Sequence, residues 1–218
     1  EFVDELSTWY LRLSRDRLKG EDRHEMSQVF GYALYTLAQL FAPISPFFPE
    51  LVHQTMVDEK TSIHHTDWPT VKTSLLHPEL EEKMTEVKKV VEQGRAMRTD
   101  LGLKLRQPLS RVTVTSTVTA PKENLLEVVK QELNVKNITW TQGSELVVEY
   151  DTLVTPELKA EGEARELMRS IQQLRRKAGL KVDEVVTVEA PVWPESWQGE
   201  IENKTKTKLV KGSELKIS

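Results

Sequence analysis

The spacing of apolar residues changes near residue 105 and divides the chain into two kinds of sequence. Up to Gly102 the apolar residues recur every three or four positions, which is the spacing of amphipathic helices. Beyond residue 105, short β-branched stretches such as Val112–Thr115 alternate with helical ones. The pattern predicts a helical bundle over residues 1–102, followed by a small α+β domain over residues 103–218.

Glycine and proline set the limits of four helices predicted in the first part. Gly20 and Gly102 are suited to the left-handed residue that ends a helix, and Pro43 cannot continue one. The second helix is apolar on more than one side, which indicates a central place in the bundle. The predicted helices span residues 1–18, 22–42, 46–56 and 78–102.

The second part is predicted to alternate between strands and helices. Its predicted strands contain residues 112–115, 135–140, 145–151 and 184–193, and its predicted helices span residues 124–133, 156–178 and 195–208. The last residues, 214–218, are consistent with an edge strand or with a cut end.

Composition excludes several classes of protein. The chain has 218 residues, 38% of them hydrophobic, and no cysteine, so disulfides, thiolate zinc sites and thiol nucleophiles are excluded. It has neither an apolar run of about 18 residues nor a signal-peptide pattern, so we expect a cytoplasmic protein that does not enter a membrane. Residue 1 is Glu, and apolar residues already recur at helical spacing from the start of the sequence. We therefore expect a fragment of a longer chain.

Positive charge is concentrated in two similar segments. The first basic segment, residues 95–111, carries a net +4, and the second basic segment, residues 165–181, carries +5. Each passes from a helix through Gly-Leu-Lys into a predicted strand. The whole chain is −4, so the remaining residues sum to −13. Such asymmetry is typical of a surface that meets a polyanion, most often a nucleic acid. Cations also favour helix C-termini, which explains part of the charge structurally.

The first predicted helix carries a smaller basic stripe. Arg12, Arg15 and Lys19 fall on one face, and Tyr10 is a candidate for stacking on a base. A solvated helix face explains the same pattern equally well.

The sequence contains little that indicates catalysis. It has no glycine-rich phosphate loop of the GxxxxGK[ST] or GxGxxG type. His64, His65 and Asp67 form the one histidine cluster, but adjacent histidines point to opposite sides and a third soft ligand is missing, so we predict no metal site. Trp9, Trp68 and Trp140 are assigned to packing on apolar stripes.

Six stretches resemble the C-terminal region of isoleucyl-tRNA synthetases, a family of class I aminoacyl-tRNA synthetases. The first three also occur in looser form in related synthetases, above all the valyl enzymes, and the last three are more specific. The resemblance covers residues 1 to about 192. The stretches are DELSTWYLRLSRDR from Asp4, LAQLFAPISPFFPELV from Leu37, SIHHTDWP from Ser62, GRAMRTDLGLKLRQPLSRV from Gly94, ELNVKNITW from Glu132 and TPELKAEGEARELMRSIQQLRRKAGL from Thr155.

The resemblance implies a part in protein biosynthesis without a catalytic site in this chain. Residues 1–102 would be the anticodon-binding bundle of an isoleucine–tRNA ligase, and residues 103–218 the appendage that follows it. The HIGH and KMSKS signatures, the editing domain and the cysteine-rich zinc module are absent. ATP and Mg²⁺ would therefore belong to the catalytic domain of the parent ligase, and no cofactor to this segment. The implied partners are tRNA(Ile) and the upstream catalytic and editing domains, not DNA or a membrane.

Charge and placement select the residues that we expect to contact RNA. Arginine and lysine neutralise phosphates, and arginine and tyrosine stack on splayed bases. An interaction module that docks on an acidic protein surface, or the equivalent region of a valyl-type synthetase, remains an alternative. RNA binding is favoured if the two basic segments lie on one continuous face with the first helix, and docking is favoured if they face opposite sides. The candidates are Tyr10, Arg12, Arg15, Lys104, Arg106, Arg169, Arg175 and Arg176.

Overall fold

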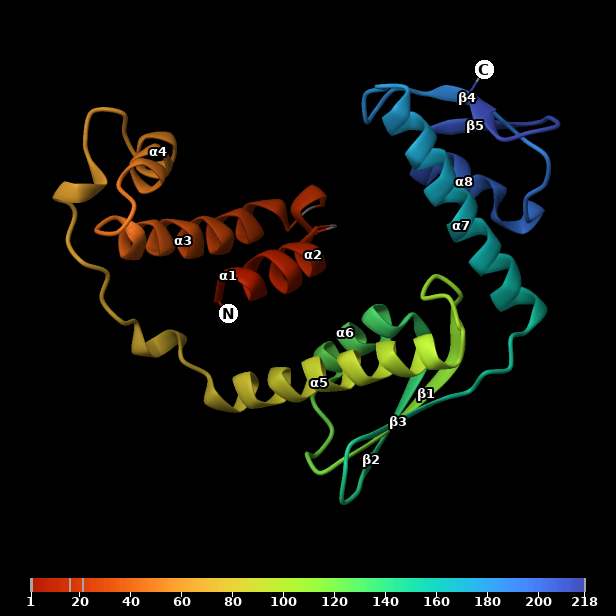
Figure 1. Cartoon of the computed structure of the whole chain (residues 1–218), viewed down its shortest axis with the longest axis horizontal. Helices are drawn as coiled ribbons and strands as arrows, with labels where there is room; N and C mark the ends of the chain where they lie inside the picture. Colours follow the sequence, from red (N-terminus) through yellow and green to blue (C-terminus); the bar gives the residue numbers. More distant parts are fainter. Residues whose placement is uncertain (1, 16, 21, 218) are drawn as a thin grey trace. The chain divides into compact units, whose positions relative to one another are not determined.

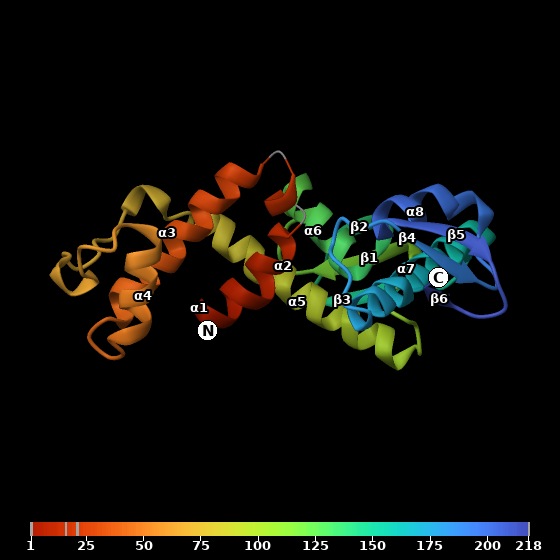
Figure 2. The ribbon, with the colours of Figure 1, turned by 90° about the horizontal axis from the view of Figure 1, so that it is seen from above.

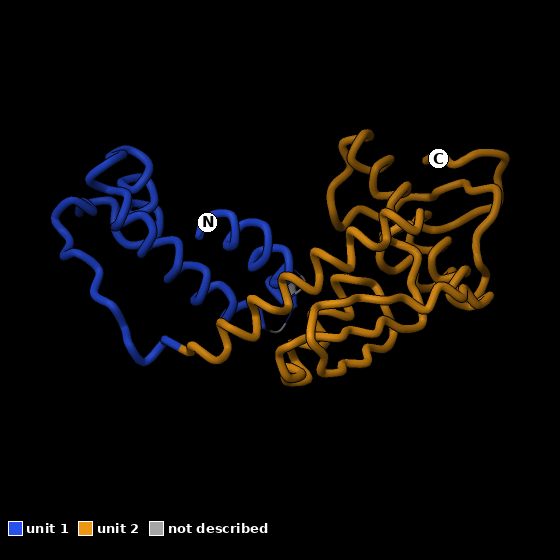
Figure 3. The backbone as a smooth tube through the Cα atoms, turned by 60° about the horizontal axis from the view of Figure 1, so that its bottom comes forward, with its two compact units in different colours: residues 1–76 blue, residues 77–218 orange. Residues whose placement is uncertain are grey.

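The computed structural model describes residues 2–15, 17–20 and 22–217. The chain forms two compact units, Glu1–Leu76 and His77–Ser218, coloured separately in Figure 3. The first unit is helical, and the second combines helices with two three-stranded sheets. The predicted fold class, a helical part followed by an α+β part, is confirmed.

The helices of the first unit follow the predicted limits closely. One helical stretch contains α1, a π-helical turn and α2, and Figure 1 shows α3 and α4 following it. Pro46 is the N-cap of α4, so this helix begins one residue after the predicted start at residue 46. The elements are α1 (Phe2–Asp4), the π turn (Glu5–Tyr10), α2 (Leu11–Ser14), a 3₁₀ turn (Arg17–Lys19), α3 (Arg23–Phe41), α4 (Phe47–Met56) and two further 3₁₀ turns (Ile63–His65 and Thr73–Leu75).

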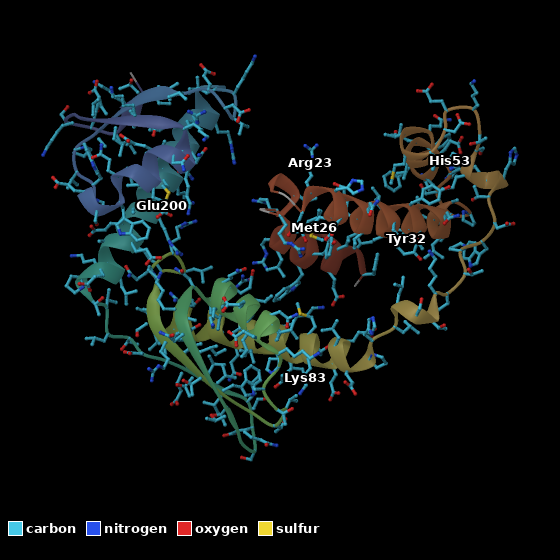
Figure 4. All side chains as sticks on the ribbon, turned by 180° about the vertical axis from the view of Figure 1, so that it is seen from behind. Arg23, Met26, Tyr32, His53, Lys83 and Glu200 are labelled. Carbon is cyan, nitrogen blue, oxygen red and sulfur yellow. The ribbon has the colours of Figure 1, made fainter. Side chains whose placement is uncertain are left out.

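A small core joins α3, α4 and the turn at Ile63. Its buried residues are Ala38, Ala42, Val52 and Ile63. Beside it, the buried His53 of α4 (labelled in Figure 4) is 2.8 Å from the Tyr35 hydroxyl and 2.8 Å from the Thr61 hydroxyl. Both imidazole nitrogens are thus hydrogen-bonded, as a buried polar ring requires.

The prediction that α3 is buried on several sides is wrong for the described residues. Val29, Leu40 and Phe41 of this helix are 51%, 41% and 42% exposed. The helix predicted to complete the bundle, α5 (Pro78–Asp100), belongs to the second unit. Its buried residues include Val87, Val90 and Val91, and the helix packs against α6 and β3.

The second unit contains the same order of elements twice. The first repeat runs helix, strand, helix, strand, strand, and the second repeat has the same order, with a 3₁₀ turn (Glu195–Trp197) before its second helix (Figures 1 and 2). The first repeat comprises α5, β1 (Leu109–Ser116), α6 (Glu123–Leu133), β2 (Val135–Gln142) and β3 (Val147–Tyr150). The second comprises α7 (Pro156–Lys177), β4 (Val186–Ala190), α8 (Gln198–Thr205), β5 (Thr207–Lys211) and β6 (Lys216–Ile217).

The two sheets also share their topology. The strand orders are β2-β1-β3 and β5-β4-β6, so in each repeat the first strand is central. The central strand pairs in parallel with the second strand of its repeat and antiparallel with the third. The helix between the parallel strands supplies the crossover that such a pair requires. The repeats therefore have one fold, and the two basic segments occupy the same position in it.

Separate cores support the two repeats. In the second repeat, Ala164 and Ile171 of α7 are buried with Val188, Ile201 and Leu209. In the first, Gly94 of α5 lies so close to Leu133 that a Cβ there would approach its methyl groups to 2.8 Å. The Tyr150 hydroxyl donates to the Gly94 carbonyl at 3.0 Å and fastens β3 to α5.

Two boundaries can be set beside the predictions. The compact units divide after Leu76, since α5 packs with α6 and β3, and the domain boundary at residue 102 stays a prediction. The last helix was expected to reach residue 208, but it ends at Thr205, where Lys206 takes a left-handed conformation with φ of 53°. The strand β5 begins directly after this residue. Lys216–Ile217 form the edge strand β6, one of the two alternatives given for the last residues.

Candidate nucleic-acid interface

The first basic segment contains a buried arginine that holds the turn from α5 to β1. Arg98 is 2% exposed, and its guanidinium donates to the carbonyl oxygens of Lys104 and Gln107, each at 3.0 Å, and of Asn134 at 3.1 Å. The guanidinium also lies over the Tyr150 ring, 5.1 Å from its centroid. Burial lowers the pKa of Arg98 below its ordinary value and raises that of Tyr150, although each group partly offsets the shift of the other.

The second basic segment contains an arginine with the same role. Arg175 is 4% exposed and donates to the carbonyl oxygens of Lys181 at 2.7 Å, Lys206 at 3.2 Å and Val182 at 3.3 Å. Arg98 and Arg175 each stand four residues before a glycine, and each donates to the carbonyl six residues after itself. The two arginines are therefore equivalent residues of the repeats.

The backbone around these arginines is also the same in both repeats. Gly102 and Gly179 have φ of 65° and 68°, and the next N–H donates back to the carbonyl of the buried arginine. This is the Schellman arrangement, in which glycine relieves the strain of the left-handed conformation. The repeated Arg-x-x-x-Gly-Leu-Lys sequence thus builds a junction, first over residues 98–109 and again over residues 175–186.

Each junction closes on a second left-handed residue. Asn134 and Lys206 have φ of 50° and 53° and directly precede β2 and β5. The Asn134 carbonyl accepts from Arg98 and from the N–H of Leu109, and the Lys206 carbonyl accepts from Arg175 and from the N–H of Val186. The arginine thereby ties the helix end to both parallel strands. Donation to the backbone favours a structural role for Arg175 over the RNA contact predicted for it.

Other candidates from the two segments meet around one carboxylate. Arg106 Nη1 lies 3.5 Å from Glu166 Oε2, and Arg169 Nη1 lies 3.5 Å from Glu166 Oε1. The three side chains are 48%, 45% and 45% exposed, so their charged groups remain in contact with water. Arg106 comes from the first segment and Arg169 from the second. The two segments therefore meet on one surface of the second unit.

The remaining candidates of the second unit are exposed. Lys104 precedes Arg106 in the first junction, and Arg176 follows Arg169 by seven residues on α7. Seven residues are close to two helical turns, so the two arginines lie on one face of α7. We call Lys104, Arg106, Arg169 and Arg176 the cationic surface of the second unit.

The candidates of the first unit have more varied environments. Arg15 is exposed, whereas Arg12 donates from Nε to the Thr8 carbonyl at 2.9 Å and lies over the Trp9 ring, 5.3 Å from its centroid. The Tyr10 hydroxyl is buried, and burial raises the pKa of this group, so the structure favours packing over base stacking for Tyr10. The Lys19 side chain lies outside the described part of the structure.

The tryptophans assigned to packing behave differently from one another. Trp140 is half-buried and donates from its indole N–H to the Val118 carbonyl at 3.0 Å, as a packed tryptophan does. Trp68 is 61% exposed, so the packing assignment is wrong for this residue within the described chain.

Sequence reasoning missed the acidic partners of the cationic residues. Glu161 is 4% exposed and lies 2.6 Å from both Lys136 and Arg165, and Glu166 joins Arg106 to Arg169. The spacings of three and four residues within α7 were a usable signal for two of these pairs. The contacts across the repeats had no local signal.

Two features of the described residues bear on other functions. Among them, no group of three or more His, Asp or Glu side chains is arranged to hold a metal ion. No helix in the described ranges is both long enough and apolar enough to cross a membrane.

Comparison with known proteins identifies the family of this chain. Residues 1–114 match the family described as the anticodon-binding domain of tRNA ligase. Similar curated proteins include isoleucine–tRNA ligases of Dehalococcoides mccartyi strain 195, at 34% identity over 85% of this chain and 21% of the relative, and of Deinococcus radiodurans, at 38% over 68% and 14%. The ligase of Streptomyces avermitilis is 39% identical over 63% of this chain and 14% of its own length. The chain thus spans about a fifth of the length of the first of these relatives. With more than half of its residues matched, the chain belongs to the anticodon-binding domain family of tRNA ligases, and it resembles the C-terminal region of isoleucine–tRNA ligases.

Proposed function

We propose that this chain binds the anticodon stem-loop of tRNA(Ile) as the C-terminal part of an isoleucine–tRNA ligase. The observation that carries the proposal is the family match over residues 1–114. The names of the similar proteins support isoleucine as the amino acid. Upstream domains of the longer, cytoplasmic ligase would catalyse the ATP- and Mg²⁺-dependent aminoacylation.

The cationic surface of the second unit supports the RNA part of this proposal. Its guanidinium groups from Arg106 and Arg169 are half-exposed and set on either side of Glu166. An exposed ion pair of this kind contributes little stability, so a phosphate oxygen can take the place of the carboxylate at small cost. Planar guanidinium groups bind phosphate through two parallel hydrogen bonds. We therefore propose that these arginines contact the tRNA backbone.

Arg12 and Arg15 extend the proposal to the first unit. Arg15 is exposed, and the contact of Arg12 with the Trp9 ring presents a flat cation at the helix surface. Both residues lie within the matched range of the family. We propose that they contact the anticodon stem-loop, while Tyr10 serves the packing of the unit.

A tRNA titration at several salt concentrations tests the proposal. We expect the logarithm of the association constant to fall with the logarithm of the salt concentration, with a slope of about −3 if four phosphates are neutralised. The double variant Arg106→Gln with Arg169→Gln should weaken binding and make the slope shallower by about one unit per lost contact. Lys122→Glu, an exposed change in the first repeat, is the control for net charge. Binding that is absent at low salt, or indifferent to salt, would refute the proposal.

A further inference from the structure

A buried carboxylate fastens α7 to the first repeat. Glu161 of this helix is 4% exposed and lies 2.6 Å from Lys136 of β2. The side-chain amide of Gln107 adds a hydrogen bond to the Leu158 carbonyl at 2.7 Å. These contacts hold α7 against the first repeat, and they fix the position of the side chains that α7 presents beside the first junction.

A second carboxylate of α7, that of Glu166, lies between two arginines of different repeats. Arg106 Nη1 is 3.5 Å from one of its oxygens, and Arg169 Nη1 is 3.5 Å from the other. Charge-assisted hydrogen bonds usually measure about 2.7–2.9 Å, so both contacts are long. Within the described ranges, neither arginine has another carboxylate partner. The cluster therefore consists of two cations that share one anion.

The surroundings of Glu166 differ from those of Glu161 in a way that allows its displacement. The Glu166 side chain is 45% exposed, whereas Glu161 is buried. Water screens an exposed ion pair, which contributes little to stability, whereas separation of a buried pair leaves an uncompensated charge. Glu161 is therefore suited to hold the two repeats together. Glu166 can leave its two partners at little cost.

A phosphate group offers the two arginines the same chemistry as the Glu166 carboxylate. Both groups are anions with at least two terminal oxygens, and planar guanidinium groups bind either one through parallel N–H donors. Arg106 and Arg169 each contact a different oxygen of the carboxylate. The carboxylate thus marks the place where one phosphate of a nucleic-acid backbone would meet both guanidinium groups.

We propose that Glu166 is a built-in competitor of RNA, which occupies a phosphate site between Arg106 and Arg169 until a phosphate of the tRNA backbone displaces it. This inference rests on the proposed function, because it takes tRNA as the ligand of the cationic surface. It adds that both repeats share one phosphate and that the carboxylate lowers the affinity of the site. The affinity of the chain for RNA is therefore set below the value that its arginines alone would give.

Replacement of Glu166 by glutamine tests the competition on the whole chain. Glu166→Gln removes the charge and keeps the size of the side chain, so a phosphate no longer has to break two exposed ion pairs. Binding of tRNA should become about three- to tenfold tighter at low salt, and the gain should shrink as the salt concentration rises. Glu82→Gln is the matched control, because it removes the same charge from an exposed position at the end of α5 that is remote from the junction. It should change the affinity by less than about twofold.

A double-mutant cycle assigns the gain to the two arginines. In a background with Arg106→Gln and Arg169→Gln, the change Glu166→Gln should raise the affinity no more than the control does, since competition requires the cations. Circular dichroism of each variant shows that it is folded.

The outcomes separate this inference from the proposed function. If the wild type binds tRNA but Glu166→Gln binds it no more tightly than Glu82→Gln does, the competition is refuted while the proposed function stands. A gain that persists without the two arginines would also overturn the competition. If neither the wild type nor Glu166→Gln binds tRNA at low salt, the proposed function itself fails, and this inference fails with it.

Discussion

The two repeats of the second unit differ in sequence at their surfaces and agree at their junctions. Each keeps a buried arginine, a left-handed glycine four residues later, and a left-handed residue before its second parallel strand. The exposed residues around these shared ones differ between the repeats. The second repeat has Arg176 at the position of Thr99 and Asp183 at the position of Arg106. The comparison shows that the repeated part of the basic segments serves the fold, while the variable part is available for binding.

A buried guanidinium explains why arginine is kept at the junction. It has five N–H donors in a fixed plane and remains charged when buried, so it can satisfy several carbonyl oxygens that strand and helix ends leave unpaired. Lysine has a single nitrogen and could not reach three carbonyls in three directions. The junction thus needs one arginine in each repeat, held by backbone carbonyl oxygens.

The largest expected effect is that of Arg98→Ala. The change leaves the carbonyl oxygens of Lys104, Gln107 and Asn134 without this donor in a buried site, which should cost about 3–5 kcal/mol of unfolding free energy. Urea unfolding followed by circular dichroism measures the loss. Glu92→Ala, an exposed change on the same helix, should alter stability by less than about 0.5 kcal/mol. Equal effects of the two variants would contradict the junction role of Arg98.

A smaller loss is expected from Gly162→Ala, which tests the contact between the repeats. The added Cβ meets the Gln107 side chain, which is anchored by donating to the carbonyl oxygens of Leu158 and Pro108. We expect a cost of about 1–3 kcal/mol by thermal unfolding, and much less in a background with Gln107→Ala. Gly199→Ala in α8 has open space around its Cβ and should be neutral or slightly stabilising. An equal loss in both backgrounds would show that the repeats do not press together here.

The smallest effect is expected when either of the two left-handed glycines is replaced. Gly102→Ala and Gly179→Ala each place a Cβ in the left-handed conformation, with no heavy atom within 4 Å of it. Strain is therefore the whole cost, about 1 kcal/mol in each repeat. Asparagine should cost less than alanine at both positions, because it tolerates this conformation better. Calorimetric melting of the four variants provides the measurement. A substitution that lowers stability in one repeat and raises it in the other would contradict the equivalence of the two glycines.

Local signals explain which parts of the fold could be predicted. Proline and glycine mark the ends of α3, α4, α5 and α7, so these helices were placed within a few residues. The strand β5 was missed because TKLVK follows a helix without a glycine or proline between them, and Lys206 takes the left-handed conformation in their place.

The candidate site was harder to predict, because burial of an arginine depends on distant residues. Arg98 and Arg175 look like their exposed neighbours in sequence, and the carbonyls of Asn134 and Lys206 that hold them lie 36 and 31 residues further along the chain. The equal spacing of arginine and glycine in the two segments was the available clue. It indicated a common turn and could have separated the repeated arginines from the variable ones.

Paired measurements on Arg175→Ala and Arg176→Ala test the central claim most directly, since these neighbours share a segment and a charge. Unfolding in urea and tRNA affinity per folded molecule should be measured for both variants. The structure predicts that Arg175→Ala lowers the unfolding free energy by several kcal/mol, about as much as Arg98→Ala does. The affinity of the folded fraction for tRNA should be unchanged. Arg176→Ala should keep its stability and bind tRNA more weakly. Retained stability with lost affinity in Arg175→Ala would contradict the division between junction and surface.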